Sequence, residues 1–355
     1  MTFSDRVKRL IGSFDEKEID GILISQSDNR YYLSGFHGSA GYLIITQEAR
    51  ILAVDFRYVE QAKRQSPDYE VLKTTLLSEW FPLLLRDLNV KRLGFESADV
   101  TYAFFRQLTE VISQAGLSVQ LVPVEGLVES LRMVKEPEEI ESIRKAVEIS
   151  DNAVEYIKGI IAPGKTERQI AWEIEKYMRE HGSGPVPFDL IVAAGRNAAL
   201  PHAQPSDYII QISDPVLVDI GARYQGYTSD ITRTFCAGTA NDQFYKVYDV
   251  VLGAQMAAIA LIKQDMTGEE ADNLARIVIQ EAGYGDAFGH SLGHGVGIAT
   301  HEMPRLGLRS GDRLRDGMVF TIEPGIYLPE WGGVRIEDTV MMENGKIKVL
   351  SKAAK

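Results

Sequence analysis

Cysteine is almost absent from this sequence, which contains one, Cys236, among 355 residues. A single cysteine cannot form an intramolecular disulfide, so the chain is not a small secreted scaffold held by disulfides. It lies in the apolar segment TRTFCAG, where a free thiol is usually a small core residue. The scarcity of cysteine favours a reducing compartment, and we expect a cytoplasmic protein.

Long apolar runs and an excess of basic residues are also missing. We find no run that approaches the roughly 18 apolar residues of a membrane span, and the opening MTFSDRVKRL lacks the apolar core of a signal peptide. Lysine and arginine total 38 against 50 aspartates and glutamates, which gives a net charge of −12. Because nucleic-acid binding requires a basic face, we expect neither a nucleic acid nor a membrane as partner.

The length allows two domains, and the sequence pattern changes after residue 124. In residues 1–124, short apolar runs alternate with amphipathic segments, which predicts an α/β domain around a central sheet. The expected strands are 21–25, 42–46, 51–54, 92–95 and 117–122, and the expected helices are an opening one through Val7 to Phe14, then 80–88 and 102–115. Segment 29–41 carries three glycines without GK[ST] or Rossmann spacing, so we expect a loop there.

Residues 125–355 are predicted to form a second, α+β domain that contains an internal repeat. A long amphipathic helix is expected from Pro137 to the vicinity of 163–164. Two capping-box patterns follow, Thr166-x-x-Gln169 and Thr267-x-x-Glu270, each opening an amphipathic segment. In each half a loop histidine, His202 or His301, is followed by a hairpin pattern. The same order twice predicts two similar halves that face each other.

Each hairpin pattern contains a pair of acidic residues. In VLVDIGARYQGYTSDITRT, residues 216–234, two apolar strands flank Gln225–Gly226 and carry Asp219 and Asp230. Residues 319–339 repeat this plan with Glu323, a loop at 332–333 and Glu337 on the returning strand. Adjacent buried carboxylates repel unless a cation or a proton lies between them. The first pair taken alone is equally consistent with ordinary turn or edge residues.

The segment between the hairpins is rich in histidine. Three of the six histidines, His290, His294 and His301, fall within residues 289–307. Four carboxylates with one imidazole suit a two-metal hydrolytic site, and the imidazole shifts preference towards Mn, Co, Fe or Zn. The glycines of GHGVG are too weakly patterned for a nucleotide loop and more plausibly let the backbone approach a substrate.

These motifs resemble those of the pita-bread metallopeptidases, specifically the proline-specific branch of Xaa-Pro dipeptidases (prolidases) and aminopeptidase P. The resemblance is close over the C-terminal two-thirds and extends to the general layout of the N-terminal third. It rests on VDIGA, SDITRT, GHGVG, EPGIY and VRIED, which place the family's five metal ligands at Asp219, Asp230, His294, Glu323 and Glu337. It implies a homodimer of metalloprotease chains with two divalent cations each, manganese being favoured over cobalt or zinc.

The resemblance also implies a role for each residue. Asp219 would hold one metal, His294 and Glu323 the other, and Asp230 and Glu337 would bridge the two. A water between the metals would be the nucleophile, and Glu323 would carry its proton to the leaving nitrogen. The implied roles of further residues are oxyanion or leaving-group contacts for His202 and His301, the proline pocket for His290, ligand orientation for Tyr327 and Arg335, and a rim contact with the partner's active site for His37.

Several of these positions have a simpler structural interpretation. The alternative for His202 is a hydrogen-bonded loop histidine, which the repeat disfavours, and the alternative for His290 is a structural histidine. Tyr327 is equally consistent with a packed strand tyrosine. Arg305, four residues after His301, resembles an arginine that some prolidases carry and that would bind the carboxylate of a terminal proline. Its alternative is a surface arginine.

Arg305 therefore favours hydrolysis of Xaa-Pro dipeptides over the alternative, an aminopeptidase acting on longer proline-containing peptides. Methionine aminopeptidase shares the ligands but usually lacks an N-terminal domain of this size. Non-catalytic pita-bread binding proteins and creatine-hydrolysing relatives lack the full ligand set, which is present here.

Overall fold

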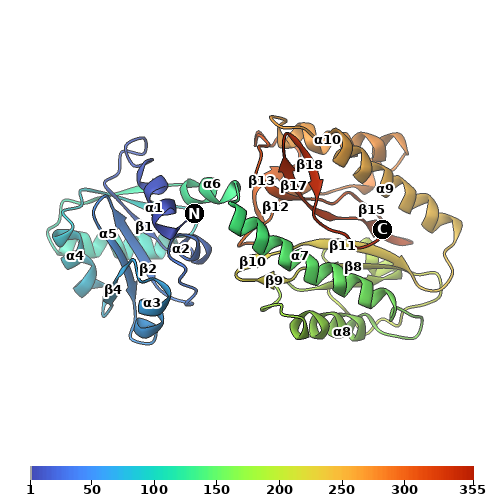
Figure 1. Cartoon of the computed structure of the whole chain (residues 1–355), viewed down its shortest axis with the longest axis horizontal. Coiled ribbons are helices and arrows are strands. Elements are labelled where there is room, and N and C mark those ends of the chain that lie inside the picture. Colours follow the sequence, from blue (N-terminus) through green and yellow to red (C-terminus); the bar gives the residue numbers. More distant parts are fainter. Residues whose placement is uncertain (1) are drawn as a thin grey trace. The chain divides into compact units, whose positions relative to one another are not determined.

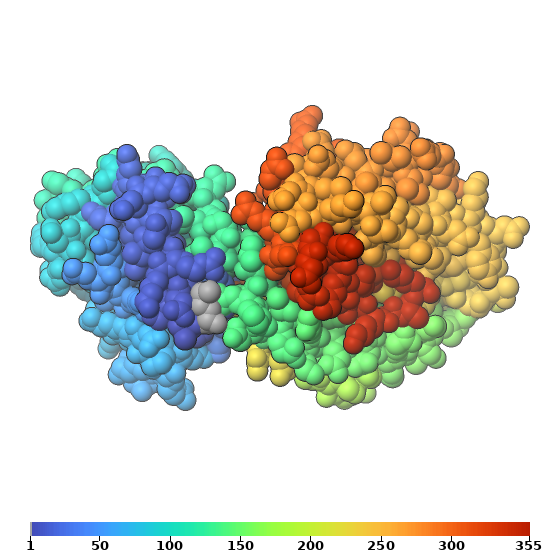
Figure 2. Space-filling model, turned by 45° about the horizontal axis from the view of Figure 1, so that its top comes forward, coloured from blue at the N-terminus to red at the C-terminus, as the bar shows by residue number. Residues whose placement is uncertain are grey.

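The computed structural model describes residues 2–355 and divides into two compact units, Met1–Arg132 and Met133–Lys355. Figure 1 shows the first unit in blue to blue-green and the second in green to red, and Figure 2 shows the packed surface of each. The division falls after Arg132, so helix α6 (Leu127–Met133) groups mainly with the first unit. The sequence-based boundary at 124/125 had placed this helix in the second domain.

The first unit is an α/β domain built on a six-stranded sheet with the order β4-β3-β2-β1-β5-β6. Only β2 runs antiparallel to its neighbours β1 and β3; the pairs β3–β4, β1–β5 and β5–β6 are parallel. The strands are β1 Gly21–Ile24, β2 Tyr42–Thr46, β3 Arg50–Val54, β4 Glu70–Lys73, β5 Arg92–Glu96 and β6 Gln120–Val124. The other helices are α1 Phe3–Ile11, α2 Ser27–Ser34, α3 Val59–Gln65, α4 Leu77–Asp87 and α5 Tyr102–Gln114. The alternation predicted from the sequence is confirmed.

The prediction of a loop at 29–41 is wrong for its first half, because residues 27–34 form helix α2. Gln26 caps its start by accepting the Asn29 amide, and Gly35 ends it in the left-handed conformation at φ 74°. Tertiary contacts stabilise the helix: the Asn29 side chain donates to Glu96 and to Glu129, 67 and 100 residues away. These partners are invisible to a local reading of the sequence.

The second unit consists of two similar halves, each with helices packed on an antiparallel sheet (Figure 1). In the first half, α7 (Pro137–Lys158) and α8 (Glu167–Glu180) cover the sheet β11-β8-β7. In the second, α9 (Asp242–Leu261) and α10 (Gly268–Glu281) cover the sheet β13-β12-β14-β17-β18. The strands are β7 Ile191–Ala194, β8 Pro215–Ile220, β11 Ile231–Cys236, β12 Gly293–Gly295, β13 Glu302–Leu306, β14 Val319–Ile322, β17 Asp338–Glu343 and β18 Lys346–Val349. Two short hairpins, β9 Arg223–Tyr224 with β10 Tyr227–Thr228 and β15 Gly325–Leu328 with β16 Gly332–Arg335, extend from them.

The repeat predicted from the two capping boxes is confirmed at both helices. Thr166 accepts the Gln169 amide while Gln169 reaches back to the Thr166 amide, and Thr267 and Glu270 do the same. Each box therefore starts its helix at the equivalent position in each half. The preceding long helix begins at Pro137 as predicted but ends at Lys158, before the expected stop near 163–164.

The second acidic hairpin is more broken than its sequence suggested. The glycines at 332 and 333 lie inside β16 rather than in a loop, and β14 pairs with β17 while β15 pairs with β16. Glu323 and Glu337 consequently lie in the breaks between consecutive strands. A close approach of the backbone explains Gly333: a Cβ there would stand 2.1 Å from the carbonyl oxygen of Ala198, which lies in the 3₁₀ helix Gly195–Ala199.

Helix α9 is long and apolar enough to cross a membrane by length and composition alone, although it contains no unbroken apolar run of that length. In the structure its residues Val247, Val251 and Ala258 are buried in the core of the second half. Cys236, expected in the core, is only half-buried because it ends β11.

Candidate metal centre

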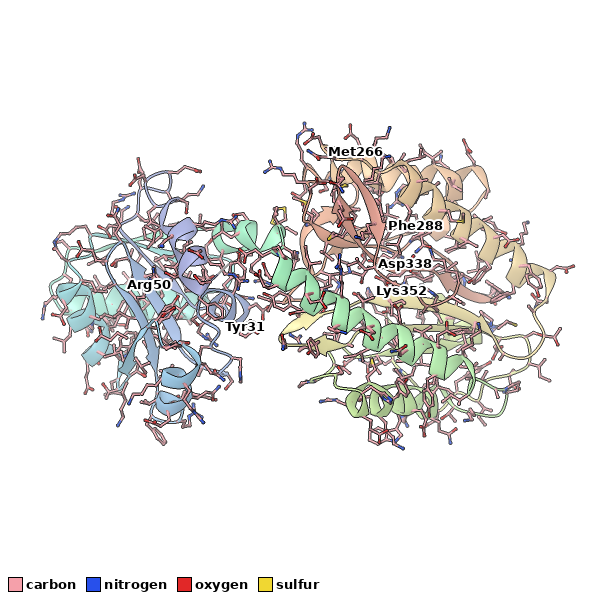
Figure 3. All side chains as sticks on the ribbon, in the orientation of Figure 1. Tyr31, Arg50, Met266, Phe288, Asp338 and Lys352 are labelled. Carbon is pink, nitrogen blue, oxygen red and sulfur yellow. The ribbon has the colours of Figure 1, made fainter. Side chains whose placement is uncertain are left out.

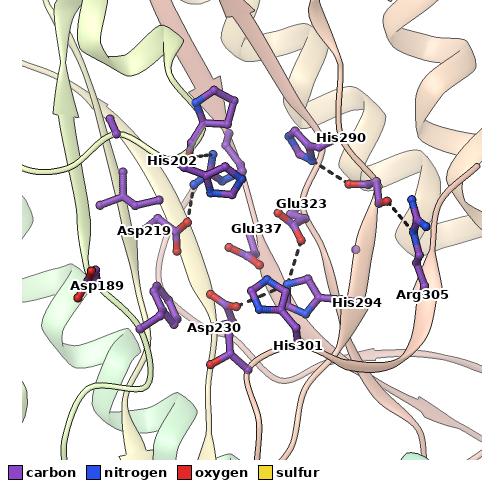
Figure 4. Close-up of a pocket in the computed structure, with 18 of the residues that line it drawn as sticks. Asp189, His202, Asp219, Asp230, His290, His294, His301, Arg305, Glu323 and Glu337 are labelled. Atoms are coloured by element: carbon purple, nitrogen blue, oxygen red, sulfur yellow. Dashed lines mark hydrogen bonds and ion pairs between the residues drawn. The ribbon is translucent and has the colours of Figure 1, made fainter. Parts of the chain in front are cut away.

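A cavity of about 590 Å³ opens in the second unit and is lined entirely by residues of that unit. Figure 4 shows acidic and histidine side chains from both halves converging in it. All five predicted metal ligands line it, together with His202, His290, His301, Arg305 and Arg335. The two halves therefore meet at the residues that the sequence singled out.

The ligands come from strand interiors and strand breaks of both sheets. Asp219 lies within β8 and Asp230 immediately before β11, whereas His294 is the middle residue of β12. One donor atom each of Asp230, His294 and Glu337 lies within 4.8 Å of the others, the spacing of a metal-binding group. Glu323 joins this group through its Oε1, which is 3.3 Å from His294 Nε2.

Asp219 stands slightly apart from that group in this structure. Its Oδ2 accepts a hydrogen bond from the Arg335 guanidinium, while its buried Oδ1 has no hydrogen-bond partner. A buried carboxylate oxygen without a donor is costly, so Oδ1 has the character of an open ligand position.

The acidic residues hold charges that the site itself does not balance. Burial, followed by the charges of Glu337 and Asp219, raises the pKa of Asp230 well above its usual value. Burial and the charges of Glu323 and Asp219 do the same to the pKa of Glu337. Burial also raises the pKa of Asp219, against the opposing charge of Arg335.

Glu323 and His294 form the opposite kind of pair. Burial alone would raise the pKa of Glu323, but the hydrogen bond and charge of His294 outweigh it and bring that pKa to about 2. Burial would lower the pKa of His294, yet the same bond to Glu323 raises it. His294 Nδ1 bonds the Gly295 carbonyl at 3.1 Å, which leaves Nε2 directed at the acidic group.

Threonines that the sequence analysis did not identify position these ligands. Thr232 Oγ1 donates to Glu337 Oε2 at 2.6 Å, and Thr321 Oγ1 donates to Glu323 Oε1 at 3.0 Å. The signal was present in SDITRT, because strand alternation directs Thr232 to the same side as its cross-strand neighbour Asp219.

A chain of hydrogen bonds connects the predicted second layer of the site. Arg335 donates to Asp219 and, at 2.8 Å, to the Tyr327 hydroxyl, which lies 2.8 Å from His290 Nε2. His290 Nδ1 is 2.8 Å from the Ser291 carbonyl and therefore carries the proton, so Nε2 accepts from Tyr327. Burial lowers the pKa of His290, which agrees with a neutral ring. With both nitrogens engaged, His290 offers the cavity an apolar ring face, which suits a proline pocket wall.

His202 and His301 are more exposed and lie nearer the open part of the cavity. The His301 ring lies 4.2 Å from the His294 ring, centroid to centroid. Burial and then the neighbouring His294 lower the pKa of His301, so it is a neutral donor or acceptor at physiological pH.

Arg305 and His37 are placed differently. Arg305 lines the cavity with an exposed side chain whose Nε donates to Ser291 Oγ at 3.2 Å (Figure 4). His37 is an exposed residue of the first unit, where its Nε2 lies 2.6 Å from the Gln65 amide nitrogen. It is not among the residues that line the cavity.

The donor set fits divalent cations. Four carboxylates and one imidazole offer hard oxygen donors with a single nitrogen, the mixture favoured by Mn, Co or Zn. Within residues 2–355, no lysine or arginine forms an ion pair with Asp230 or Glu337. Cations from solution would supply the positive charge that the chain leaves out.

Comparisons with known proteins agree with this chemistry. A model of metallopeptidase family M24 matches residues 141–344, and one of the creatinase/prolidase N-terminal domain matches residues 6–134. The chain is 41% identical to an Xaa-Pro dipeptidase of Pyrococcus horikoshii over 98% of its length and 97% of the relative's. The structure of an Xaa-Pro dipeptidase from Bacillus anthracis matches at a TM-score of 0.95 and 40% identity, covering 100% of this chain and 99% of that one. An X-Pro aminopeptidase from Thermotoga maritima matches at 0.91 and 36%, covering 98% of each.

The family resemblance drawn from five short motifs is therefore confirmed, and so is the two-domain fold with duplicated catalytic halves. The matches span nearly the whole of this chain and of its relatives. The protein belongs to metallopeptidase family M24 and carries the creatinase/prolidase N-terminal domain ahead of its catalytic domain.

Proposed function

We propose that this metallopeptidase is an Xaa-Pro dipeptidase, which hydrolyses the bond before a C-terminal proline and uses two divalent cations, preferably manganese. The observation that carries the proposal is Arg305, a cation in the same cavity as the ligand cluster. Figure 4 shows Arg305 at one side, beyond His290 and Glu323, and Asp219 towards the other. A dipeptide with its carboxylate at Arg305 would place its scissile bond over the acidic group.

The chain's own residues supply binding, orientation and proton transfer. When bound, the two cations would activate a water and polarise the scissile carbonyl. Glu323, a carboxylate oriented by the Thr321 hydroxyl, can accept a proton from the attacking water and pass it to the leaving nitrogen. His301, neutral and beside His294, can donate to the oxygen on which negative charge develops. His202 in the other half contributes a second such contact.

Residues behind the ligands and His290 fix the orientation of these side chains. Arg335 fixes one oxygen of Asp219 and, through Tyr327, orients His290. Thr232 and Thr321 orient Glu337 and Glu323. Such outer contacts determine ligand position and basicity and are expected to affect activity almost as strongly as the ligands.

Product size separates the two proline-specific activities. A dipeptidase must recognise the free carboxylate of the proline, whereas an aminopeptidase must leave that direction open. Arginine presents a planar fork of donors that matches a carboxylate. Among residues 2–355, Ser291 is the one hydrogen-bond partner of the Arg305 side chain, so the guanidinium retains donors for a substrate.

The decisive experiment compares Arg305→Ala with wild type on an Xaa-Pro dipeptide and on an Xaa-Pro tripeptide. We expect KM for the dipeptide to rise about tenfold or more, the scale of ~1.5–3 kcal/mol for a charged hydrogen bond. The tripeptide, which has no carboxylate at that position, should change little. Arg309→Ala serves as the control, because it removes the same charge from an exposed position three residues after the end of β13, the strand that carries Arg305, and Arg309 does not line the cavity.

A second candidate is an Xaa-Pro aminopeptidase, favoured by the close structural match to the Thermotoga maritima enzyme. A wild-type preference for the tripeptide, or an equal loss of both substrates in Arg305→Ala, would support this activity instead.

We also propose a cytoplasmic homodimer in which His37 reaches the rim of the partner's active site. The exposed position of His37 supports this contact. Sedimentation of the purified protein tests the dimer, and His37→Ala should raise KM without changing Mn²⁺ affinity. A fully active monomer would contradict it.

A further inference from the structure

Arg233 is among the most deeply buried large side chains of the protein, at 1% exposure. It follows Thr232 in β11, and alternation along the strand points it away from the cavity that Thr232 faces. All five of its N–H donors are used. Nε donates to Ala354 O at 3.1 Å, one NH₂ group to Thr232 O at 2.9 Å and Glu337 O at 2.5 Å, and the other to Asp338 Oδ1 and Ala353 O at 2.7 Å each.

Asp338 is the partner of this arginine and has no exposed surface. Its second oxygen, Oδ2, lies 2.7 Å from Lys355 Nζ and 3.3 Å from Gln255 Nε2. Gln255, itself fully buried on α9, also donates to the carbonyl of Ile322 at 3.1 Å. Asp338 thus joins a strand, a helix and the end of the described chain.

The placement of this group relative to the ligands is informative. Arg233 donates a hydrogen bond to the carbonyl of Glu337 itself, and Gln255 donates one to the carbonyl of Ile322, the residue before Glu323. On the front of the same backbone, the Thr232 hydroxyl holds the Glu337 carboxylate. The backbone that carries two predicted ligands is therefore held from behind by the Arg233–Asp338 pair.

Segment 351–355 completes the arrangement. Figure 2 shows the C-terminal residues in red on the surface of the second unit, and Figure 3 labels Lys352 beside Asp338. Its backbone amides at 352 and 353 donate to Asp151 of α7, at 2.8 and 2.9 Å, while the carbonyls of Ala353 and Ala354 accept from Arg233. Lys355 pairs with Asp338, and Ser351 Oγ accepts from the Thr339 amide at 3.0 Å, so the segment ties α7 of the first half to β17 of the second.

We infer that Arg233 and Asp338 are positioning residues of the metal centre, which set the location of Glu337 without touching metal or substrate. Glu337 is a predicted bridging ligand, so a small displacement of its backbone changes its distance to both cations. The inference rests on the proposed two-metal site but not on the choice of dipeptide or longer peptide. A buried ion pair can also serve stability alone, which the test must separate.

Stability and metal affinity can be separated by removing one or both charges. Arg233→Met leaves Asp338 without this partner and should lower the melting temperature of the metal-free protein. Adding Asp338→Asn removes the carboxylate charge that has lost its arginine partner, and we expect the double variant to regain part of the lost melting temperature. Its Mn²⁺ affinity should not recover with it. Calorimetric titration of metal-free protein with Mn²⁺ should show that the dissociation constant of the weaker binding step rises about tenfold or more in both variants.

Arg233→Lys keeps the charge but offers three donors on a flexible stem in place of five on a fixed fork. It should fold close to normally and bind Mn²⁺ with intermediate affinity, with kcat reduced and KM for an Xaa-Pro dipeptide nearly unchanged. The matched control is Arg30→Met. Arg30, 3% exposed in the first unit, likewise donates to backbone carbonyls, those of Ser25, Gly38 and Gly41. It should reduce stability and leave Mn²⁺ affinity at the wild-type value.

Each outcome decides one question. The positioning role would be overturned if Arg233→Lys bound Mn²⁺ with wild-type affinity. It would also be overturned if the double variant recovered its Mn²⁺ affinity together with its melting temperature. Wild-type protein that binds fewer than two Mn²⁺ would overturn the two-metal site, and the positioning role with it.

Discussion

Because the metal centre carries excess negative charge, we expect that removing one of these charges stabilises the metal-free protein but weakens metal binding. Replacing Asp230 by asparagine keeps the size of the side chain and removes its charge. In the metal-free protein this should raise thermal stability while weakening Mn²⁺ binding severely. The reason is that Asp230 is buried beside Glu337, with no arginine or lysine paired to either among residues 2–355.

The magnitude follows from distance and from protonation. Donor oxygens of Asp230 and Glu337 lie within 4.8 Å, and two unit charges at that separation repel by about 3–4 kcal/mol at an effective dielectric constant near 20. The chain can avoid this repulsion by keeping a proton, which costs about 1.4 kcal/mol for each pH unit above the unfolded pKa. At each pH the folded chain bears the smaller of these two costs. This is the repulsion of about 3–4 kcal/mol at pH 8 and the cost of the proton, about 1.5 kcal/mol, at pH 5.

The sign of the pH dependence follows from the raised pKa of Asp230. Its folded pKa lies above the unfolded value near 3.8, so the folded chain holds a proton that the unfolded chain has released. The stability of the metal-free protein therefore falls as the pH rises from about 4 through the raised pKa. Asparagine has no proton to hold, so its advantage over aspartate grows with pH.

Differential scanning calorimetry of metal-free wild type and Asp230→Asn at pH 5 and pH 8 tests this reasoning. For a unit of this size we expect a gain in melting temperature on the order of 10 °C at pH 8 and on the order of 4 °C at pH 5. Saturating Mn²⁺ should reverse the order of the two proteins. Asp249→Asn, at an exposed position on α9, is the control and should show no such trend. An equal or lower melting temperature for metal-free Asp230→Asn at pH 8 would refute the argument.

Other consequences can be tested on the same preparation. Wild type saturated with Mn²⁺ should contain two ions per chain by metal analysis, and one ion with full activity would contradict the bridging roles. His294→Ala should abolish the tighter Mn²⁺ step in calorimetry and lower kcat by several orders of magnitude with the fold retained. Asp219→Asn should abolish the weaker step, because Arg335 already balances part of that charge. Tyr327→Phe removes the hydroxyl between Arg335 and His290 and should lower kcat/KM about tenfold, which unchanged kinetics would disprove.

Local patterns in the sequence predicted the elements that carry the site. A capping box is decided by four consecutive residues, so the second helix of each half, at Glu167 and at Gly268, starts where the sequence indicated. Four of the predicted ligands lie within or next to strands whose apolar residues are visible in the sequence, whereas His294 lies in the three-residue strand Gly293–Gly295. The assignment of these five residues to one ligand set came from the resemblance of the motifs to the family.

What the sequence could not predict depends on partners far along the chain. Helix α2 looks polar and glycine-flanked, but its Asn29 is held by residues 67 and 100 positions away. Arg233 was read only as part of a motif, because its partners Ala353 and Ala354 lie 120 residues away or more. Long-range hydrogen bonds of this kind leave no periodic signal, since nothing in the local pattern specifies which distant carbonyl accepts.

The distribution of counter-charges distinguishes structural from functional acids in this unit. Asp338 and Asp272 are fully buried, and each has an arginine partner from the chain, Arg233 at 2.7 Å and Arg276 at 2.6 Å. Asp230 and Glu337 are buried nearly as deeply and have neither arginine nor lysine among their described ion-pair partners. A fold that balances its structural carboxylates internally and leaves these two without an arginine or lysine needs either a proton on one of them or positive charge from outside. Since solvent is largely excluded from them, bound cations are the group that can provide it, and the choice of residues thereby ties the stability of the site to its loading with metal.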